Sequence, residues 1–355
     1  GLGDVYKRQG HDNAILIHVT LIPYLSASQE LKTKPTQASV KDLQGMGIQP
    51  DIIVCRSEHP LDQSIKDKIA LFCNVPQSHV LQNLDVEYLY EAPLAMEKEH
   101  LAQVACECLH LDCPEPDLTD WKKMVEDLRH PTDEVQVALV GKYVSLHDAY
   151  ISVVEALKHG GITNHATVHI KWIDSETVTP ENVEELLGDC NGVLVPGGFG
   201  SRGIEGKILA IQYARTHGIP FLGLCLGMQL TIVEYARNVI GYTDAHSVEL
   251  DPNTTHPVIA LMPDQNGVED IGGTLRLGAY PCVLDKDSRA YRLYGQENIS
   301  ERHRHRYEVN NDYRAVLTEH GLRLSGLSPD GRIVEMCELT EHPFFVATQG
   351  HPELK

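Results

Sequence analysis

The chain has 355 residues, enough for two domains that each bury a core of their own. Hydrophobic residues make up 42% of it and charged residues 23%, which excludes a disordered or fibrous protein. The formal net charge of −20 opposes general binding to nucleic acid or to an anionic membrane, and we expect neither as a partner. No apolar run reaches the ~20 residues that a membrane-spanning helix needs.

The cysteines and the N-terminus indicate the compartment. The 9 cysteines are an odd number with irregular spacing, and no secretory signal precedes them, so we expect a reducing cytoplasm. Residues 1–9 neither continue a hydrophobic period nor lead into the strand that follows. We interpret them as a non-native scar of sequence assembly.

Two short apolar runs with a helical pattern between them predict a βαβ unit near the N-terminus, and two further helices follow. The elements expected here are strands at 14–19 and 51–55 and helices at 37–46, 62–73 and 94–109. We predict that residues 10–109 form the C-terminal part of an α/β domain whose beginning is absent.

Residues 110–134 are rich in proline and acid around one helical stretch near Trp121, as in an interdomain linker. Regular alternation of strands and helices then predicts a second domain over residues 135–355. Its expected elements are strands at 135–141, 167–173, 192–195 and 220–224 and helices at 149–159, 181–187 and 204–217. The predicted fold class is α/β, with two domains that each contain a mostly parallel, doubly wound sheet, the first one partial.

A cysteine stands where the last of these strands gives way to a helix. Cys225 lies between Gly223 and Gly227, which is the G-x-C-x-G spacing of a nucleophile elbow. The helix N-terminus favours the thiolate, and the glycines let neighbouring backbone pass closely. A buried cysteine in a packing turn of small residues is the alternative.

Two other segments supply what a thiol nucleophile needs. TQGHPE places the imidazole of His351 two residues before the carboxylate of Glu353, a base with an orienting anion, although such a motif alone is more often a surface turn. PGGFGSRG (196–203) exposes backbone N–H groups at the C-terminal edge of the sheet, where an oxyanion must be held. It could also be a packing loop, and its spacing does not fit a dinucleotide fingerprint. Together the three segments predict cysteine catalysis.

The strings PGGFGSRG, GLCLGMQL, HSVEL, ERHRHRYEVN and QGHPE resemble, in this order, the class I glutamine amidotransferase domain of the CTP synthase family over residues 135–355. The resemblance implies that Cys225 is the nucleophile, His351 the general base and acid, and Glu353 its orienting partner. It also implies an oxyanion hole from the N–H groups of Gly198 and Leu226. The glutamine-binding residues implied in this way are Gly198, Leu226, Gly227, Met228, Gln229, Glu249 and Arg306.

Two departures from the family accompany this resemblance. The family usually has an apolar residue before the catalytic histidine, where this chain has Gly350, which loosens the backbone. The chain also stops at Lys355, soon after Glu353, so we expect a final covering helix to be missing.

Basic residues cluster in two places. RHRHR (302–306) has a strand-like alternation and favours an anion or carboxylate site, with a solvated face as the alternative. KTKPTQ (32–37) offers two lysines, two hydroxyls and a helix N-terminus to a triphosphate, or is an exposed polar loop. ELKTKPTQ, GIQPDIIVCRS and KIALFCNVP resemble the UTP- and CTP-binding part of CTP synthase over residues 18–109. The nucleotide-binding residues so implied are Lys32, Thr33, Lys34, Pro35, Thr36, Gln37 and Lys68, with Arg56 in support and Asp85 and Val86 near the ATP base.

A cysteine-rich stretch near the end of the first domain resembles a metal set at first sight. Its members are Cys106, Cys108, His110 and Cys113. On a helix the second of these points away from the others, and no second pair exists elsewhere, so we expect a helix end with partly buried thiols and no metal in this chain. By position alone, GGTLRLG (272–278) is a candidate for a GTP-responsive lid.

The resemblance implies ATP-dependent amination of UTP to CTP with ammonia from glutamine. It also implies ATP with Mg²⁺, GTP as an activator, CTP as a product inhibitor and a homotetramer. This chain has no phosphate-binding loop of the G-x-x-x-x-G-K-[ST] type, and the acidic Mg²⁺ ligands are expected upstream, so we expect at most glutamine hydrolysis from the chain alone. Two alternatives stay open: an amidotransferase domain that serves another synthetase, and a nucleotide-responsive assembly subunit without catalysis.

Overall fold

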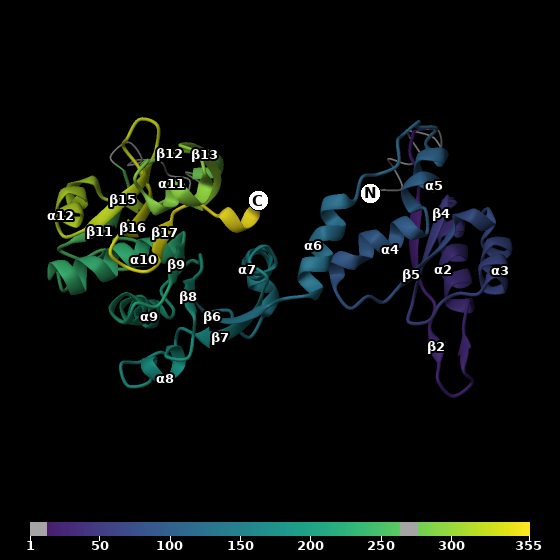
Figure 1. Cartoon of the computed structure of the whole chain (residues 1–355), viewed down its shortest axis with the longest axis horizontal. Coiled ribbons are helices and arrows are strands. Elements are labelled where there is room, and N and C mark those ends of the chain that lie inside the picture. The colour runs from purple at the N-terminus through teal and green to yellow at the C-terminus, as the bar shows by residue number, and fades with distance from the viewer. Residues whose placement is uncertain (1–12, 263–275) are drawn as a thin grey trace. The chain divides into compact units, whose positions relative to one another are not determined.

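A computed structural model of the chain describes residues 13–262 and 276–355 (Figure 1). The chain divides into two compact units, Gly1–Arg129 and His130–Lys355, which we call the N-terminal and C-terminal units. Within the described ranges, no helix is long and apolar enough to cross a membrane. The segment 1–9 and residues 272–275 of the predicted lid lie outside the described residues.

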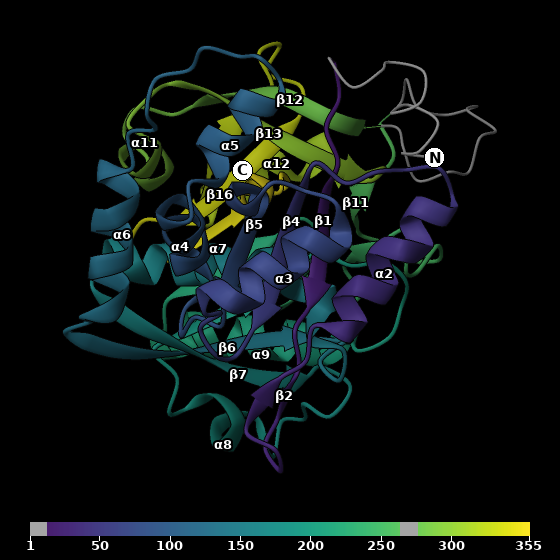
Figure 2. The ribbon, with the colours of Figure 1, turned by 90° about the vertical axis from the view of Figure 1, so that its right-hand side faces the viewer.

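The N-terminal unit is a parallel three-stranded sheet, in the order β1-β4-β5, between two layers of helices (Figure 2). Its elements are β1 (Ile17–Leu21), β2 (Tyr24–Leu25), β3 (Glu30–Leu31), α2 (Lys34–Gly45), β4 (Ile52–Ser57), α3 (Gln63–Cys73), β5 (Val80–Leu84), α4 (Ala92–Lys98), α5 (Leu101–Cys108) and α6 (Thr119–Arg129). Strand β4 is buried on both faces: Ile53 packs with α2 and α3, and Val54 with α4 and α5. Such continuous apolar burial is typical of a central parallel strand.

Two features of this unit were not predicted. The expected helix 94–109 is two helices, because His100 between them has a left-handed backbone with φ 60°. Strand β5 has the sequence VLQNL, whose polar residues hide its period.

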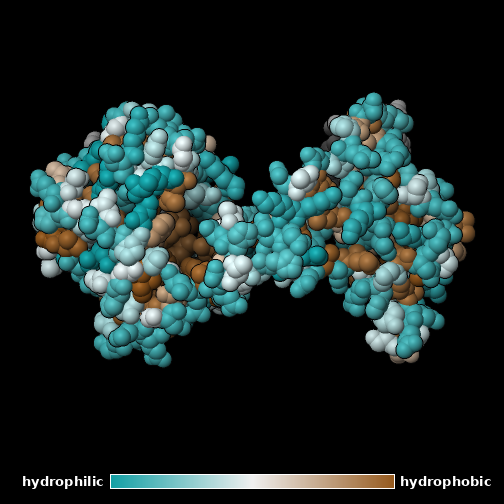
Figure 3. All heavy atoms as spheres, viewed as in Figure 1, coloured by the Kyte–Doolittle hydropathy of each residue, from teal (hydrophilic) through white to brown (hydrophobic). Residues whose placement is uncertain are grey.

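Large apolar side chains also stand on the surface, among them Leu71 and Phe72 of α3, and Figure 3 shows hydrophobic patches on the unit drawn at the right.

The C-terminal unit contains a nine-stranded sheet in the order β13-β12-β15-β16-β17-β9-β8-β6-β7. The strands from β17 to β7 run parallel, and those from β13 to β17 pair antiparallel. The strands are β6 (Asp133–Gly141), β7 (Ala166–Asp174), β8 (Gly192–Val195), β9 (Phe221–Leu224), β12 (Arg276–Leu284), β13 (Asn298–His305), β15 (Leu322–Leu327), β16 (Val334–Leu339) and β17 (Phe345–Thr348). A small second sheet contains β10 (His246–Ser247), β11 (Pro257–Ala260) and β14 (Glu308–Val309).

Helices cover both faces of the large sheet. They are α7 (Ile151–Thr163), α8 (Val183–Leu187), α9 (Ile204–His217), α10 (Leu226–Tyr235), α11 (Arg289–Tyr294) and α12 (Arg314–Glu319). Helix α10 is buried from end to end in the largest core, together with α9, whereas α7 packs on the other face. The predicted α/β fold with parallel, helix-covered sheets is therefore confirmed, and the antiparallel half is an addition to it.

Candidate active site

The predicted nucleophile stands in a strained turn between β9 and α10. Cys225 has φ 51° and ψ −103°, a backbone conformation that L-residues rarely adopt. The turn also requires its glycines: a Cβ on Gly227 would lie 2.2 Å from the carbonyl oxygen of Val195, and one on Gly223 would lie 2.9 Å from the backbone of Gly227. The local sequence thus places the thiol at the N-terminus of α10, where the helix dipole favours a thiolate.

The order of the strands brings the predicted base to this turn. Strand β17 pairs in parallel with β9, so that Thr348 is the partner of Leu224 and its carbonyl accepts a 2.8 Å hydrogen bond from the N–H of Cys225. The loop that follows β17 carries His351, whose side chain hydrogen-bonds with Cys225 and whose Nδ1 lies 2.8 Å from Oε1 of Glu353. Sulfur, imidazole and carboxylate therefore form one chain of contacts at the carboxyl end of the parallel strands.

The charges of this chain of contacts reinforce one another. Burial lowers the pKa of His351, but its hydrogen bonds and charge interactions with Cys225 and Glu353 outweigh burial and raise that pKa to about 10. At neutral pH the imidazole therefore holds a proton beside the thiol, the arrangement that stabilises a reactive thiolate.

The predicted oxyanion hole and glutamine site share one cavity of about 260 Å³ beside the sulfur. Its lining includes Gly198, Phe199, Cys225, Leu226, Gln229, Glu249, His305, Arg306 and Tyr307. The N–H of Leu226 is the first of helix α10, and the first N–H groups of a helix have no acceptor within it. The Nε of Arg306 is buried and has no partner among the described residues. A small anionic group in this cavity would supply one.

Not every predicted glutamine contact faces this cavity. Met228 is fully buried in the core, and Gly227 packs against the backbone of Val195, so neither belongs to the lining. The side chain of Gln229 does belong to it, but its Nε2 is already bonded to the carbonyl of Tyr307 at 3.0 Å and to Oε1 of Gln349 at 3.2 Å. Glu249 and Arg306 therefore remain as the charged groups available to a ligand.

A second, larger cavity of about 630 Å³ meets the first at the nucleophile. Cys225, His351 and Glu353 line it, together with Tyr143, Phe199, Leu277, Arg302 and Arg304. Strand β13 alternates as expected: His303 and His305 point into the protein, and Arg302 and Arg304 point outward. The basic cluster therefore divides among the first cavity, which Arg306 lines, this second cavity and a buried network.

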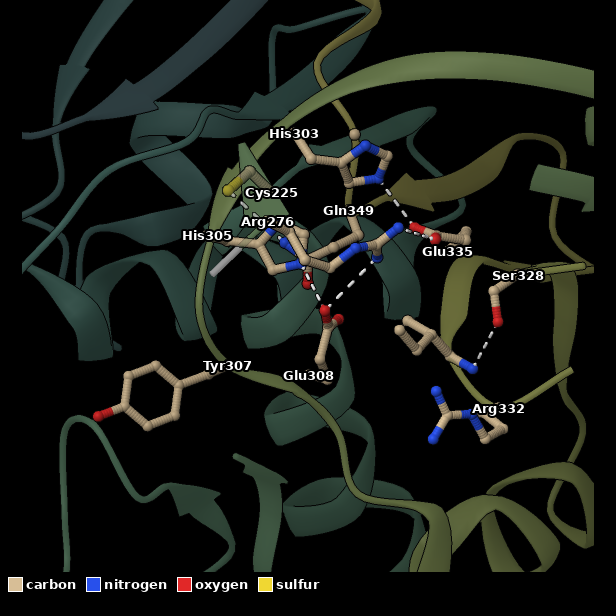
Figure 4. A network of polar contacts seen from close by, with 12 residues as sticks. Cys225, Arg276, His303, His305, Tyr307, Glu308, Ser328, Arg332, Glu335 and Gln349 are labelled. Atoms are coloured by element: carbon tan, nitrogen blue, oxygen red, sulfur yellow. Dashed lines mark hydrogen bonds and ion pairs between the residues drawn. The ribbon is translucent and has the colours of Figure 1, made fainter. Parts of the chain in front are cut away.

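The buried histidines belong to a network of charged side chains with two glutamates and one arginine (Figure 4). Arg276 donates to Glu335 at 2.7 Å and to Glu308 at 3.4 Å. His303 Nε2 lies 2.8 Å from the other oxygen of Glu335, and His305 Nε2 lies 2.8 Å from Glu308. All five side chains are at most 7% exposed, so each charge depends on its partners. His303, His305 and Glu308 lie within the string ERHRHRYEVN (301–310) and Arg276 within GGTLRLG (272–278), but Glu335, which completes the network, lies outside every motif of the sequence.

The predicted nucleotide site begins at helix α2. Thr33 is its N-cap residue, and Lys34 and Pro35 open its first turn. The hydroxyl of Thr36 is buried and donates to Oγ1 of Thr20 at 3.1 Å, and the hydroxyl of Thr33 accepts from Gln37 at 3.0 Å. The lysines and the helix N-terminus, rather than Thr36, are therefore what this segment offers an anion.

The other predicted nucleotide contacts lie on neighbouring elements. Lys68 is exposed on α3, and Lys32 pairs with Glu30 before α2. Arg56, near the end of β4, forms a 2.6 Å ion pair with Asp85, which follows β5. Val86 instead lines a cavity of about 580 Å³ with residues of α4 and α6.

The cysteine-rich stretch does not assemble a metal site in the part of the chain that the structure describes, where no three His, Cys, Asp or Glu side chains are grouped as metal ligands. Helix α5 ends at Cys108, and His110 beyond it has a left-handed backbone. Cys106 and Cys113 hydrogen-bond to each other, a contact that raises the pKa of Cys106. All 9 cysteines are free thiols.

Comparison with known proteins assigns the fold to a class. The family model "Glutamine amidotransferase class-I" matches residues 145–355, and the chain belongs to this family. A second model, "CTP synthase N-terminus", matches residues 2–111, including most of the segment that we interpret as a scar. The two models in this order confirm the predicted resemblance to the CTP synthases.

Individual relatives agree with this assignment. The CTP synthases of Clostridium perfringens (strain 13 / Type A) and Clostridium acetobutylicum are 59% and 56% identical to the chain over 98% of its length. The chain spans 65% of the length of these relatives. The solved Trypanosoma brucei CTPS glutaminase domain with bound acivicin is 39% identical, with a TM-score of 0.58 over 62% of this chain and 87% of that one.

Proposed function

We propose that the C-terminal unit hydrolyses glutamine to glutamate and ammonia. The observation that carries this proposal is the contact chain Cys225–His351–Glu353. Its sulfur lines a cavity in which a buried nitrogen of Arg306 has no partner among the described residues. In that cavity the ammonium group of glutamine pairs with Glu249 and its carboxylate with Arg306. The side-chain amide then points at the sulfur.

The chemistry proceeds through an acyl-enzyme. The thiolate of Cys225 attacks the amide carbon and forms a C–S bond, while the carbonyl electron pair moves to oxygen. The N–H groups of Gly198 and Leu226 stabilise the resulting oxyanion. When the intermediate collapses, the C–N bond breaks, and His351 gives its proton to the leaving nitrogen, which departs as ammonia.

Water completes the cycle. His351, now neutral, takes a proton from a water molecule, and the hydroxide attacks the thioester carbon. The C–S bond breaks, glutamate leaves, and the thiolate is regenerated beside the imidazolium. Glu353 stabilises that imidazolium and keeps its Nδ1 proton oriented throughout.

A chloroketone analogue of glutamine tests this proposal. Its carbonyl occupies the oxyanion hole, and its CH₂Cl group alkylates the sulfur with loss of chloride. We expect one label per chain, on Cys225 by peptide mass spectrometry, with protection by glutamine. Cys113→Ser serves as the control, because Cys113 is an exposed thiol outside the site and its loss should leave labelling unchanged. Labelling spread over several cysteines, or insensitive to glutamine, would count against the proposal.

We further propose that the N-terminal unit belongs to a CTP synthase, which aminates UTP to CTP at the expense of ATP and with the ammonia so produced. The CTP synthase N-terminus match over residues 2–111 supports this over an amidotransferase that serves another synthetase. The contacts that join Cys225, His351 and Glu353 disfavour a non-catalytic assembly subunit, which would not need them. A homotetramer, GTP activation, CTP inhibition and a cytoplasmic location are the accompanying proposals, the last in keeping with the free cysteines.

Among the described residues, no three His, Cys, Asp or Glu side chains are grouped so that they could hold a metal ion, and no step here uses Mg²⁺.

Nucleotide binding by the N-terminal unit has its own test. UTP added to the chain should raise the melting temperature, and Lys34→Ala at the start of α2 should abolish the shift. Lys122→Ala, on α6, is the control. A shift of equal size in both variants would contradict a site at α2.

A further inference from the structure

One buried lysine beside the active site has no role in the chemistry above. Lys207 lies in the first turn of α9, is 1% exposed and has no hydrogen-bond or ion-pair partner among the described residues. Its ammonium nitrogen lies 3.9 Å from the position that a Cβ on Gly198 would occupy, and a methyl of Leu226 lies 3.7 Å from the same point. The charge therefore stands directly behind the two residues proposed for the oxyanion hole, outside both cavities.

The charged groups around α9 do not neutralise this ammonium. The one with a resolved effect is Lys142, after β6, which binds the carbonyl of Phe199 and, by repulsion, adds to the effect of burial. Three carboxylates on α9 and the elements around it are paired with other residues: Glu205 with Arg237, Glu234 of α10 with Arg215, and Glu176 with Arg202. Two more, Glu184 and Glu185 of α8, are exposed on the surface.

An isolated buried ammonium is costly to a folded protein, because it loses the hydration of its charge and gains no counter-charge. Such a group persists where its charge has a use, and here an oxyanion would form on the far side of the Gly198 backbone. We propose that Lys207 is a positioning residue for glutamine hydrolysis, whose charge behind Gly198 gives the oxyanion-hole loop a positive potential and stabilises the negatively charged intermediate. This inference rests on the proposed hydrolysis of glutamine.

The charge is lost within an accessible pH range. Burial, followed by the repulsion from Lys142, lowers the pKa of Lys207 to about 8. The turnover rate should therefore step down as pH rises through about 8, separately from any step of His351 near 10. Removal of Lys142 should raise the midpoint of the first step.

The experiment compares the whole chain with Lys207→Met, which keeps the length and packing of the side chain. Glutamate release is measured between pH 6.5 and 10. At pH 7 we expect kcat to fall about tenfold with KM within twofold, because the lost interaction belongs to the intermediate rather than to bound glutamine. The variant should also lack the step near pH 8. An unchanged kcat with the same pH profile overturns the inference.

Lys142→Met gives a second, independent readout in a chain that keeps Lys207. The step should move to higher pH, and an unmoved step contradicts the inference even where Lys207→Met fails to fold. Failure of the proposed function can be distinguished from failure of this inference. If the wild-type chain neither releases glutamate nor reacts with the chloroketone, both proposals are wrong. If the wild-type chain does both and Lys207→Met has the same kcat and pH profile, only the inference about Lys207 is wrong.

Discussion

The amide Nε2 of Gln349 donates a hydrogen bond to the sulfur of Cys225 over 3.6 Å, although 124 positions separate the two residues. Gln349 is fully buried, and its own oxygen accepts from Gln229. The side chain thus links the nucleophile to the wall of the 260 Å³ cavity.

A donor to sulfur stabilises negative charge on it, so Gln349→Met should make Cys225 a weaker nucleophile. We expect the rate of iodoacetamide alkylation at Cys225 to fall severalfold at pH 7, together with a severalfold loss of kcat. Mass spectrometry of the labelled peptide over a time course measures the rate. An unchanged rate would show that the contact does not influence the thiol.

Glu353→Gln should destabilise the protonated form of His351, because it removes the negative charge beside the imidazole. In the wild type the pKa of this imidazole rises from 6.5 to about 10 on folding, so proton binding stabilises the folded state fully below pH 6.5 and the effect is lost as pH rises through 10. The variant should therefore unfold more easily than the wild type at pH 6.5 and equally easily above pH 10. Denaturant unfolding of the two proteins at both pH values measures the difference. A stability gap that widens toward pH 10 would contradict the assignment.

Arg306→Gln should remove the partner of the substrate carboxylate while the nucleophile stays in place. We expect KM for glutamine to rise at least tenfold, with a smaller change in kcat, because the lost contact exists in the ground state as well as the transition state. Steady-state glutamate release gives both constants. Alkylation of Cys225 by iodoacetamide, which has no carboxylate, is the control and should proceed at the wild-type rate.

Gly227→Ala should destabilise the C-terminal unit by about 3 kcal/mol, since its methyl would meet the carbonyl of Val195 at 2.2 Å and neither backbone can yield easily. The matched control is Gly160→Ala near the end of helix α7, where nothing lies within 4 Å. That change should stabilise the unit by about 0.5–1 kcal/mol. Melting temperatures that move in the same direction for both would argue against the close approach at the elbow.

Arg276→Met should cost about 3–5 kcal/mol of stability, because it leaves Glu308 and Glu335 buried without their cation. Adding Glu335→Gln to this variant should recover part of the loss, since one uncompensated charge disappears. Lys286→Ala, which breaks an exposed pair with Glu297, is the control and should leave the unfolding transition nearly unchanged. Additive losses in the double variant would contradict direct coupling.

The parallel core could be predicted because its signals are local. Strands such as β8 and β9 are continuous apolar runs, and α9 was expected at the bounds that it has, since glycines with φ 67° and 69° flank it. Of the antiparallel strands, β13 was indicated by the alternation in residues 302–306, whereas β12, β15 and β16 were not predicted. In β16 the charged residues Glu335 and Glu338 lie buried and interrupt the apolar pattern. Their burial depends on partners that only the folded sheet supplies.

The residues of the candidate site show the same difference between local and non-local signals. Cys225 and His351 carry motifs of neighbouring residues, and the structure brings them together. Gln349 lies within such a motif but has no signature of its own, and Arg276 and Lys207 act through space on residues of other elements. A sequence pattern describes neighbours along the chain, and these three matter through neighbours across it.

The place of β17 in the large sheet has a consequence for synthesis of the chain. This strand lies between β9 and β16, so it joins the parallel half of the sheet to the antiparallel half, and it is the last of the strands in sequence. While the ribosome is still translating, β9 has an open edge and the thiol of Cys225 has no imidazole beside it. The nucleophile therefore acquires its partner only after residue 351 has left the ribosomal tunnel, and until then the nascent chain holds an unpaired thiol next to a strand that is free to pair wrongly.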